Sequence, residues 1–397
     1  ISWATNETGT SNLQYGPTTS YGSTINSGGT TSHSVTLSGL SSGTSYNYRI
    51  SATDSSGNNS LSSNQTFTTN SVVVDPPVTP PVTPPSIPSG TPTPTGTGKY
   101  LYVSPTGNDS VTYANNNASN PWRTIGRATW GSTNRSAPNS TEAAKAGDVV
   151  LVSGGSYDST EVVNNRFTSL YNPVNSGSSG NYITFACVGD CTLTAPNANG
   201  PAIGSSGRAY VKWFANVSQG NSWMINACGR INGCGTNVVD TVADTGPVVC
   251  HNTNNCWVEG AVINGGQGID YADNWNAIRI ENCTSCVIRN NTATSFVRDP
   301  IAGGTNHNQS IITMYGSSNS LYEYNTGSNA GAGIYLKDTG TTQLQSGNII
   351  RFNRLDSVGE VFAFSVTAEG RNYIYQNIGT NSSSGLSIVG GGLSNDW

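Results

Sequence analysis

A short pattern recurs at Ile278-Arg-Ile280, Ile312-Thr-Met314, Ile334-Tyr-Leu336, Phe364-Ser-Val366 and Leu386-Ser-Ile388. Apolar residues two positions apart are typical of a strand that buries one face. Each copy except the last is followed by a second strand in which an apolar or aromatic residue precedes an asparagine by three positions. These pairs are Ile288 and Asn291, Tyr322 and Asn325, Ile350 and Asn353, and Ile374 and Asn377.

The repeat of about 22 to 34 residues is the length of one coil of a parallel β-solenoid. In such a fold each coil buries its apolar face only by stacking on its neighbours. We therefore predict that five apolar side chains lie directly over one another. They are Ile280, Met314, Leu336, Val366 and Ile388.

The composition favours the same architecture. Gly, Ser, Thr and Asn dominate, only 10% of the residues are charged, and the 397 residues include two methionines, which is unlike a helical bundle. The length allows two or three domains, and a hydrophobic content of 35% indicates a narrow, elongated core. The 17 Lys and Arg residues are scattered in a chain of net charge -5, so we expect no nucleic-acid partner.

The eight cysteines fall in four close pairs: Cys187 with Cys191, Cys228 with Cys234, Cys250 with Cys256, and Cys283 with Cys286. An even count in a composition typical of exported proteins favours disulfides and an extracellular or cell-surface location, with the connectivity open. Zinc is the alternative, because Cys283 and Cys286 have the C-x-x-C spacing. No apolar run approaches the roughly 18 residues that span a bilayer, and no leader begins at Ile1, which indicates a mature chain or a fragment.

Many N-x-S/T sequons agree with an exported glycoprotein, although a chain rich in Asn, Ser and Thr forms some of them by composition alone. The candidate acceptors are Asn6, Asn58, Asn64, Asn108, Asn117, Asn134, Asn139, Asn216, Asn290, Asn308 and Asn381. Asn282 is a poorer acceptor because Cys283 follows it.

Residues 1–70 alternate apolar and polar residues in short strands, which predicts a small β-sandwich. The run Leu37-Ser-Gly-Leu40-Ser-Ser-Gly43-Thr44-Ser-Tyr46-Asn-Tyr48 resembles the fibronectin type III signature. The resemblance implies that Trp3 is a buried strand residue and that Tyr46 forms a tyrosine corner. It also implies that one or more N-terminal strands are missing.

Residues 71–98 contain the repeats Pro76-Pro-Val-Thr79 and Pro80-Pro-Val-Thr83. Proline fixes φ and lacks an N–H donor, so this stretch is predicted to be a semi-rigid polyproline II linker. The interleaved Thr79 and Thr83 leave an O-glycosylated stalk as the alternative.

Residues 99–397 open with Tyr100-Leu-Tyr-Val-Ser-Pro105, Asn120-Pro-Trp-Arg-Thr-Ile125 and Ala146-Gly-Asp-Val-Val-Leu-Val-Ser-Gly154-Gly-Ser-Tyr157. This order of a strand, a short helix over the open end and a second strand resembles the pectate-lyase-like right-handed β-helix superfamily. The expected fold class is all-β, a right-handed single-stranded parallel β-helix with an N-terminal β-sandwich. The resemblance is poor for function, because that superfamily includes lyases, hydrolases, isomerases, tailspikes and inert surface proteins.

Residues between the inward ones point outward and stack in columns about 4.8 Å apart. One predicted column is Glu281, Tyr315, Lys337, Thr367 and Val389, and the next is Arg279, Thr313, Tyr335, Ser365 and Ser387. Polysaccharide lyases of this superfamily remove a proton beside a uronate carboxylate. The resemblance then implies that Lys337 is the base, that Arg279 holds the carboxylate, and that Tyr315 or His307 is the acid. Ca²⁺ would be held by Glu281, Asp299 and Asp338.

The competing interpretation is that these residues are an ordinary solvated face, because no three acids have calcium-ligand spacing. It makes the chain a non-catalytic extracellular structural glycoprotein without a cofactor or metal, and it is the leading prediction. Glycan binding by Tyr315, Tyr335 and Tyr375, and hydrolysis by Asp270 and Asp273, are further alternatives. His251 is predicted to be a turn residue.

The chain begins at Ile1 in what resembles a second strand and ends at Gly390-Gly-Gly-Leu-Ser-Asn-Asp-Trp397 without an obvious capping helix. Unpaired strand edges favour pairing with another chain. We therefore expect copies of the protein to associate end to end into a fibre or stalk, with a simple fragment as the alternative.

Overall fold

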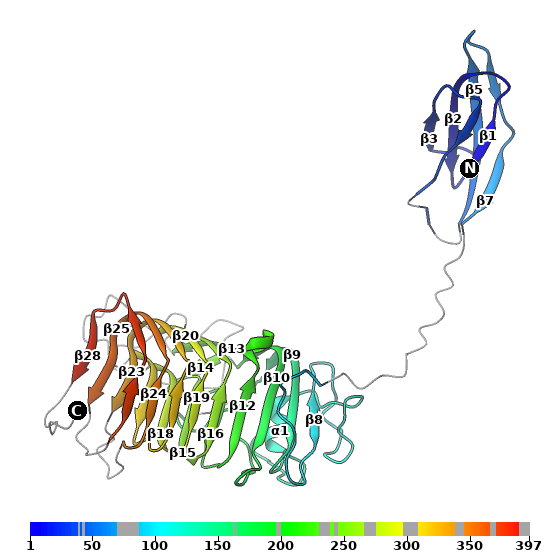
Figure 1. Ribbon diagram of the computed structural model, residues 1–397. Helices are drawn as coiled ribbons and strands as arrows, with labels where there is room; N and C mark the ends of the chain where they lie inside the picture. The colour runs from blue at the N-terminus through cyan, green and yellow to red at the C-terminus, as the bar shows by residue number, and fades with distance from the viewer. Residues whose placement is uncertain are drawn as a thin grey trace. The chain divides into compact units, whose positions relative to one another are not determined.

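The computed structural model describes residues 1–38, 40–41, 44–69, 87–161, 163, 165–195, 200–229, 239–241, 245–265, 275–296, 309–337, 345–365 and 371–388. The chain divides into two compact units, Ile1–Thr83 and Pro84–Trp397 (Figure 1). The repeats at Thr79 and Thr83 lie outside the described residues.

The first unit consists of antiparallel strands. They are β1 (Ser2–Ala4), β2 (Gly9–Gly16), β3 (Ser23–Ser27), β4 (Ser32–Ser34), β5 (Ser45–Asp54), β6 (Asn59–Leu61) and β7 (Gln65–Thr68). Strand β1 pairs with β4, while the other sheet has the order β3-β2-β5-β6 with β7 also on β5. The two antiparallel sheets agree with the predicted N-terminal sandwich.

Two details of this unit bear on the fibronectin type III resemblance. The hydroxyl oxygen of Tyr46 accepts a hydrogen bond of 3.1 Å from the backbone N–H of Ser41, five residues upstream, as a tyrosine corner requires. Trp3 is half-buried, stacks on His33 with ring centroids 5.0 Å apart, and donates from Nε1 to Oγ of Ser11. Trp3 is therefore less buried than the resemblance implies, and membership of that family stays a prediction.

The second unit contains the remaining elements. They are β8 (Tyr100–Val103), α1 (Ile125–Trp130), β9 (Val149–Asp158), β10 (Ile183–Thr194), β11 (Ile203–Ser206), β12 (Val211–Ala215), η1 (Val217–Gln219), β13 (Ser222–Gly229), β14 (Val239–Thr241), β15 (Val248–Asn254), β16 (Cys256–Glu259), β17 (Ala261–Asn264), β18 (Trp275–Thr284), β19 (Val287–Arg289), β20 (Thr292–Phe296), β21 (Gln309–Tyr315), β22 (Leu321–Glu323), β23 (Thr326–Lys337), β24 (Ile349–Arg351), β25 (Arg354–Ser365), β26 (Tyr373–Tyr375), β27 (Ile378–Thr380) and β28 (Ser384–Ile388).

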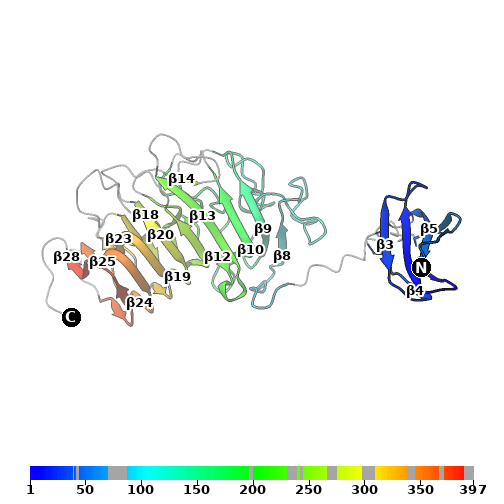
Figure 2. The same ribbon diagram turned by 90° about the horizontal axis from the view of Figure 1, so that it is seen from above.

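These strands pair in parallel with strands of neighbouring coils along the length of the unit (Figure 2). Apart from β14, which pairs with β13, they form three stacks. The first stack is β11-β15-β18-β21-β23-β25-β28, the second is β8-β9-β10-β12-β16-β19-β22-β24-β26, and the third is β10-β13-β17-β20-β23-β25-β27. Strands β10, β23 and β25 bend and contribute to more than one stack. The predicted all-β chain with a parallel β-helix is confirmed by this strand pairing.

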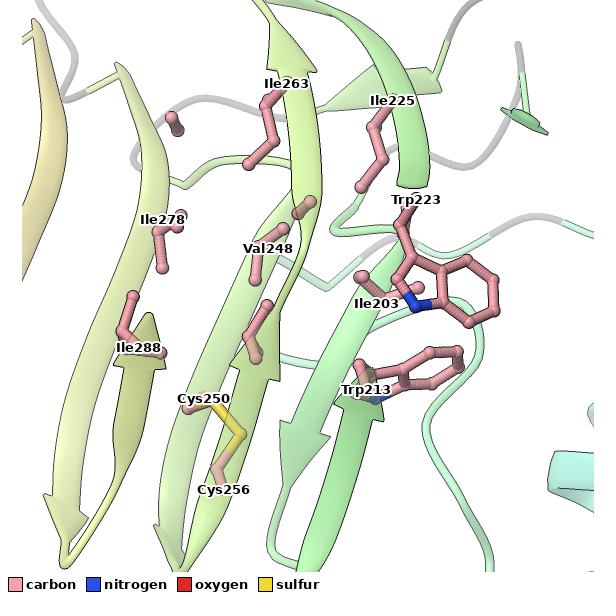
Figure 3. Packing of buried hydrophobic residues seen from close by; sticks show 14 of the residues in the cluster. Ile203, Trp213, Trp223, Ile225, Val248, Cys250, Cys256, Ile263, Ile278 and Ile288 are labelled. Carbon is pink, nitrogen blue, oxygen red and sulfur yellow. A yellow bond between two sulfur atoms is a disulfide. The ribbon is translucent and has the colours of Figure 1, made fainter. Parts of the chain in front are cut away.

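Apolar side chains from successive coils fill the interior of the β-helix (Figure 3). In the first stack Ile280 pairs in register with Met314, and Met314 with Leu336, as predicted. Leu336 then pairs with Phe364 rather than with Val366, and Phe364 pairs with Ile388. The prediction for Val366 was therefore wrong by two residues. A slip of two positions keeps every side chain on its face, so alternation alone does not detect it.

A row of buried asparagines runs along the start of the third stack. Nδ2 of Asn291 donates to Oδ1 of Asn325 at 3.0 Å. In the same way Asn325 donates to Asn353 at 2.9 Å, and Asn353 donates to Asn377 at 2.8 Å. Each Oδ1 also accepts the backbone N–H of the preceding asparagine in the row. The predicted asparagine spacing therefore forms a hydrogen-bonded ladder that keeps the coils in register.

Helix α1 follows β8 and packs against β9. The Oγ1 atom of Thr124 caps its first turn by accepting from the N–H of Arg127, and Gly131 ends it in the left-handed conformation with φ 71°. Before β8, the N–H of Thr95 donates to the carbonyl of Gly147 at 3.0 Å. The last residues of the expected linker are thus bonded to the β-helix. No helix in the described ranges is long and apolar enough to cross a membrane.

Candidate functional site

The outward face of the first stack carries a polar column that the sequence predicted in part. We call it the outer column. In register it consists of Ser206, His251, Glu281, Tyr315 and Lys337, and the backbone of Ser365 is the next register partner. The predicted run from Glu281 through Tyr315 to Lys337 is confirmed as a set of register partners. Ser365 takes the place predicted for Thr367 because of the two-residue slip, and Val389 lies outside the described residues.

A buried ion pair lies at the centre of the outer column. Nε and Nη2 of Arg279 approach Oε2 of Glu281 at 2.9 Å and 2.7 Å, and the two side chains are 6% and 14% exposed. The residues are two positions apart on β18, so both point outward from one strand. Arg279 therefore carries a compensated charge, and a substrate carboxylate reaching it has to compete with Glu281.

Aromatic rings and cations alternate along this face. Tyr315 lies with its ring centroid 4.2 Å from Cζ of Arg279 and 5.6 Å from Nζ of Lys337. Nζ of Lys337 is also 5.6 Å from the ring centroid of Tyr335. Tyr315 and Tyr335 are only 5% and 2% exposed, so neither presents the open ring face that a glycan-stacking platform requires. Lys337 is half-buried.

His251 belongs to this face, and the sequence reasoning missed it. It lies in β15 as the register partner of Glu281, not in a turn as predicted. Its ring stacks on Phe167 with centroids 4.4 Å apart. Burial lowers the pKa of His251 below its usual value, and Arg279 acts in the same direction while Glu281 opposes it. The signal in the sequence is the alternation at Val248 and Cys250: if these two residues point inward, His251 points outward.

Beside the outer column lies a small buried polar cluster. Oδ1 of Asn276 accepts from Oγ of Ser310 at 2.8 Å and from Oγ1 of Thr313 at 2.6 Å, and the two hydroxyls contact each other. Thr313 and Tyr335 are register partners, as predicted, and Ala363 follows them where Ser365 was predicted. The side chains of Asn276, Ser310 and Thr313 are all 0% exposed, so this cluster is closed off from solvent.

The calcium site implied by the lyase resemblance is not formed by the described residues. Glu281 is engaged by Arg279, while Asp299, Asp338 and the candidate acid His307 lie outside the described ranges, as do Asp270 and Asp273. Within those ranges no three His, Cys, Asp or Glu side chains gather as a metal site would require.

Three of the four predicted cysteine pairs are disulfides. They join Cys187 to Cys191, Cys250 to Cys256 and Cys283 to Cys286. The second of these bridges β15 and β16 inside the core (Figure 3). Cys283 and Cys286 are therefore bonded to each other rather than arranged around zinc. Cys234 lies outside the described residues, so the pairing of Cys228 stays a prediction.

Most candidate glycosylation sites lie at the surface. Asn6, Asn58, Asn64, Asn108, Asn117, Asn134, Asn139 and Asn381 are exposed, whereas Asn216, Asn282 and Asn290 are half-buried. Asn308 lies outside the described residues. The modification of these residues, the extracellular location and the end-to-end assembly stay predictions.

The outward face of the second stack carries a ladder of alternating charge. Glu259, Arg289, Glu323 and Arg351 are successive register partners. Arg289 lies 3.7 Å from each glutamate, and Arg351 lies 2.8 Å from Glu323. Lys212 approaches Glu259 at 3.9 Å, and its Nζ lies 3.8 Å from the ring centroid of Trp257. Burial lowers the pKa of Lys212 to about 8, although Glu259 opposes the shift.

Comparison with protein-family models and with curated proteins finds no match. Among solved structures, the family 28 exopolygalacturonase of Yersinia enterocolitica aligns with 88% of this chain at 11% identity and a TM-score of 0.38. The catalytic domain of a GH87 alpha-1,3-glucanase aligns with 96% at 13% identity and a TM-score of 0.33, and a pectate lyase with 75% at 13% identity and a TM-score of 0.23. The alignments span 61%, 57% and 78% of those chains. Similarity this low assigns no activity, and the fold rests on the strand pairing itself.

Proposed function

We propose that the β-helix acts on an acidic polysaccharide that lies along the outer column. The supporting observation is the order of groups on consecutive coils, His251, Glu281, Tyr315 and Lys337, with Arg279 beside them. A polymer parallel to the helix axis would meet an imidazole, a carboxylate, a phenol and an amine at successive steps of about 4.8 Å. This is the set of groups that acid–base chemistry on a charged sugar chain needs.

The reaction that fits these groups is β-elimination from a uronate polymer. Lys337, as the general base, takes the proton beside the carboxylate, the bond to the glycosidic oxygen breaks, a carbon–carbon double bond forms, and the leaving oxygen takes a proton from the Tyr315 hydroxyl. A substrate carboxylate that competes with Glu281 for the guanidinium of Arg279 would be neutralised there. The non-catalytic structural role expected from the sequence gains no support from the described residues.

Incubation with polygalacturonate and with alginate tests this proposal. We expect new ultraviolet absorbance from unsaturated sugars, and a loss of about a hundredfold or more in rate for Lys337→Met, since a general base contributes about 10²–10⁴-fold. Lys212→Met, on the second stack, is the matched control and should keep the wild-type rate. New reducing ends without ultraviolet absorbance would show that the reaction is hydrolysis and not elimination. Absence of turnover on both polymers, or full activity in Lys337→Met, overturns the proposal.

A further inference from the structure

A single residue in the left-handed conformation turns each coil from the second stack into the third. In four successive coils this position is held by Asn290, Tyr324, Phe352 and Gln376, with φ of 54°, 55°, 56° and 53°. Each residue directly precedes an asparagine of the buried ladder, so its backbone is held firmly in place. Gly260, with φ 80°, holds the equivalent position one coil earlier.

Tyr324 and Phe352 are unexpected at such a position. Glycine adopts positive φ freely and asparagine tolerates it, whereas a bulky side chain there costs roughly 1–3 kcal/mol. Two consecutive coils therefore carry aromatic residues at a position where neighbouring coils have Gly260 and Asn290, whose residue types tolerate positive φ better. Strain of this kind is tolerated when the side chain has a use.

Of the two strained rings, Tyr324 is exposed and Phe352 is half-buried. Tyr324 is 48% exposed and stacks on Phe352, with centroids 5.0 Å apart and an interplanar angle of 12°. Phe352 meets Tyr375, which is 40% exposed, edge-on at 6.3 Å. We call Tyr324, Phe352 and Tyr375 the aromatic corner. A stack that served only stability would gain more by being buried, because burial of apolar area is the main stabilising term.

Fixed polar groups border these rings. Nη1 of Arg351 donates to the hydroxyl of Tyr375 at 3.1 Å, and Nε of Arg351 donates to Oε2 of Glu323 at 2.8 Å. The Arg351 side chain is 33% exposed. The aromatic corner thus offers ring surface for C–H groups and, beside it, donors and acceptors already held in position.

The size and shape of the corner select the class of ligand. A fully buried aromatic side chain removes about 150–250 Å² of its surface from water. The three rings of the aromatic corner are each at most about half exposed, so a ligand can bury only part of that area. The corner therefore falls well below the roughly 800 Å² per partner of a stable protein interface. Its rings follow one another coil by coil, so the ligand it fits is narrow and repeating. A sugar ring has an apolar face to stack and hydroxyls at its edge to bond.

We propose that the aromatic corner is a glycan-binding site, separate from the outer column and independent of whether that column is catalytic. Oligosaccharide chains bind with sugar rings against Tyr324 and Tyr375 and with hydroxyls bonded to Arg351, which Glu323 holds in place. The sequence pattern predicts a stacking role for Tyr375 but not for Tyr324 or Phe352, because their placement follows from a positive φ that the pattern does not show.

Binding to an array of neutral and acidic plant and bacterial polysaccharides tests this site, with the double variant Tyr324→Asn/Phe352→Asn. Asparagine suits the left-handed conformation, so we expect the variant to keep or raise the melting temperature while its affinity for the glycan bound by the wild type falls about tenfold or more. Phe352→Tyr, which keeps a ring, should bind as the wild type does. Lys212→Met, in β12 and outside both the aromatic corner and the outer column, should also keep this affinity.

Four results overturn the inference. One is wild-type binding to no polysaccharide of the array, and another is unchanged affinity in the double variant. The third is a melting temperature several degrees lower in the double variant, which would show that the rings serve the fold. Sedimentation of the wild type also matters, because self-association that disappears in the double variant would make a second copy of the chain the occupant instead.

Discussion

Nδ2 of Asn325 donates a hydrogen bond of 2.9 Å to Oδ1 of Asn353, its equivalent one coil further along. It also donates to the carbonyl of Ile288 at 2.9 Å, while its Oδ1 accepts from both nitrogens of Asn291. With an exposure of 2%, Asn325 leaves no room for water to replace these partners.

Replacing Asn325 by Leu should therefore leave several buried polar groups without hydrogen-bond partners. Each unsatisfied group costs about 1–3 kcal/mol, so we expect the free energy of unfolding to fall by about 3 kcal/mol or more. Chemical denaturation measures this. Asn377→Leu is the control, because Asn377 is half-buried and lies in the last described coil. Equal losses for the two variants would contradict the importance of burial in the ladder.

The Arg279–Glu281 pair predicts a second contrast. Removing one partner of a buried pair costs about 3–5 kcal/mol because the other charge remains uncompensated. We expect Arg279→Met to approach this loss. Arg351→Met should lose less, since Arg351 is 33% exposed and Glu323 keeps Arg289 at 3.7 Å. Thermal unfolding of both variants decides, and a larger loss for Arg351→Met would be the contrary result.

His251 predicts a dependence of stability on pH. Its pKa is lowered in the folded protein, so the unfolded chain binds the proton more readily. The contribution of His251 is then complete above the unfolded pKa of about 6.5 and is lost as pH falls through the lower folded pKa. His251→Gln should flatten the decline of the melting temperature below about pH 6.5. An identical pH profile for wild type and variant would exclude this role.

Lys212 predicts a titration in the alkaline range. Its folded pKa of about 8 lies below the ordinary 10.5, so the neutral amine is favoured by folding. The stability it contributes is present above pH 10.5 and is lost as pH falls toward 8. NMR of ¹³C-labelled lysine should show one side chain titrating near pH 8 that is missing in Lys212→Met. Titration of all lysines near their ordinary pKa would refute the expectation.

The coils were predictable because stacking imposes local rules. Every coil must place apolar residues two positions apart, and the ladder needs an asparagine at one fixed position. The spacing of Ile288 and Asn291, and of their equivalents in other coils, therefore indicates the fold. Val366 was misplaced because Phe362, Phe364 and Val366 all satisfy the same alternation. Which of the three pairs with Leu336 depends on the length of the turns in that coil. An alternation with a period of two is the same for all three residues and does not specify this.

The candidate site was less predictable. The outer column follows from alternation, which correctly brought Glu281, Tyr315 and Lys337 together. The burial of Tyr335 does not follow, because periodicity specifies which way a side chain points and not what packs over it. Tyr324 and Phe352 were missed for a different reason: their importance lies in a positive φ, which no side-chain pattern at these positions indicates.

The charge ladder of the second stack limits how a chain of this kind can gain or lose length. Glu259, Arg289, Glu323 and Arg351 alternate in sign coil by coil. Excision of the coil that carries Glu323 would bring two guanidinium groups into register, and duplication of it would oppose two carboxylates. Viable insertions and deletions in this region should therefore come in even numbers of coils, a parity rule set by electrostatics.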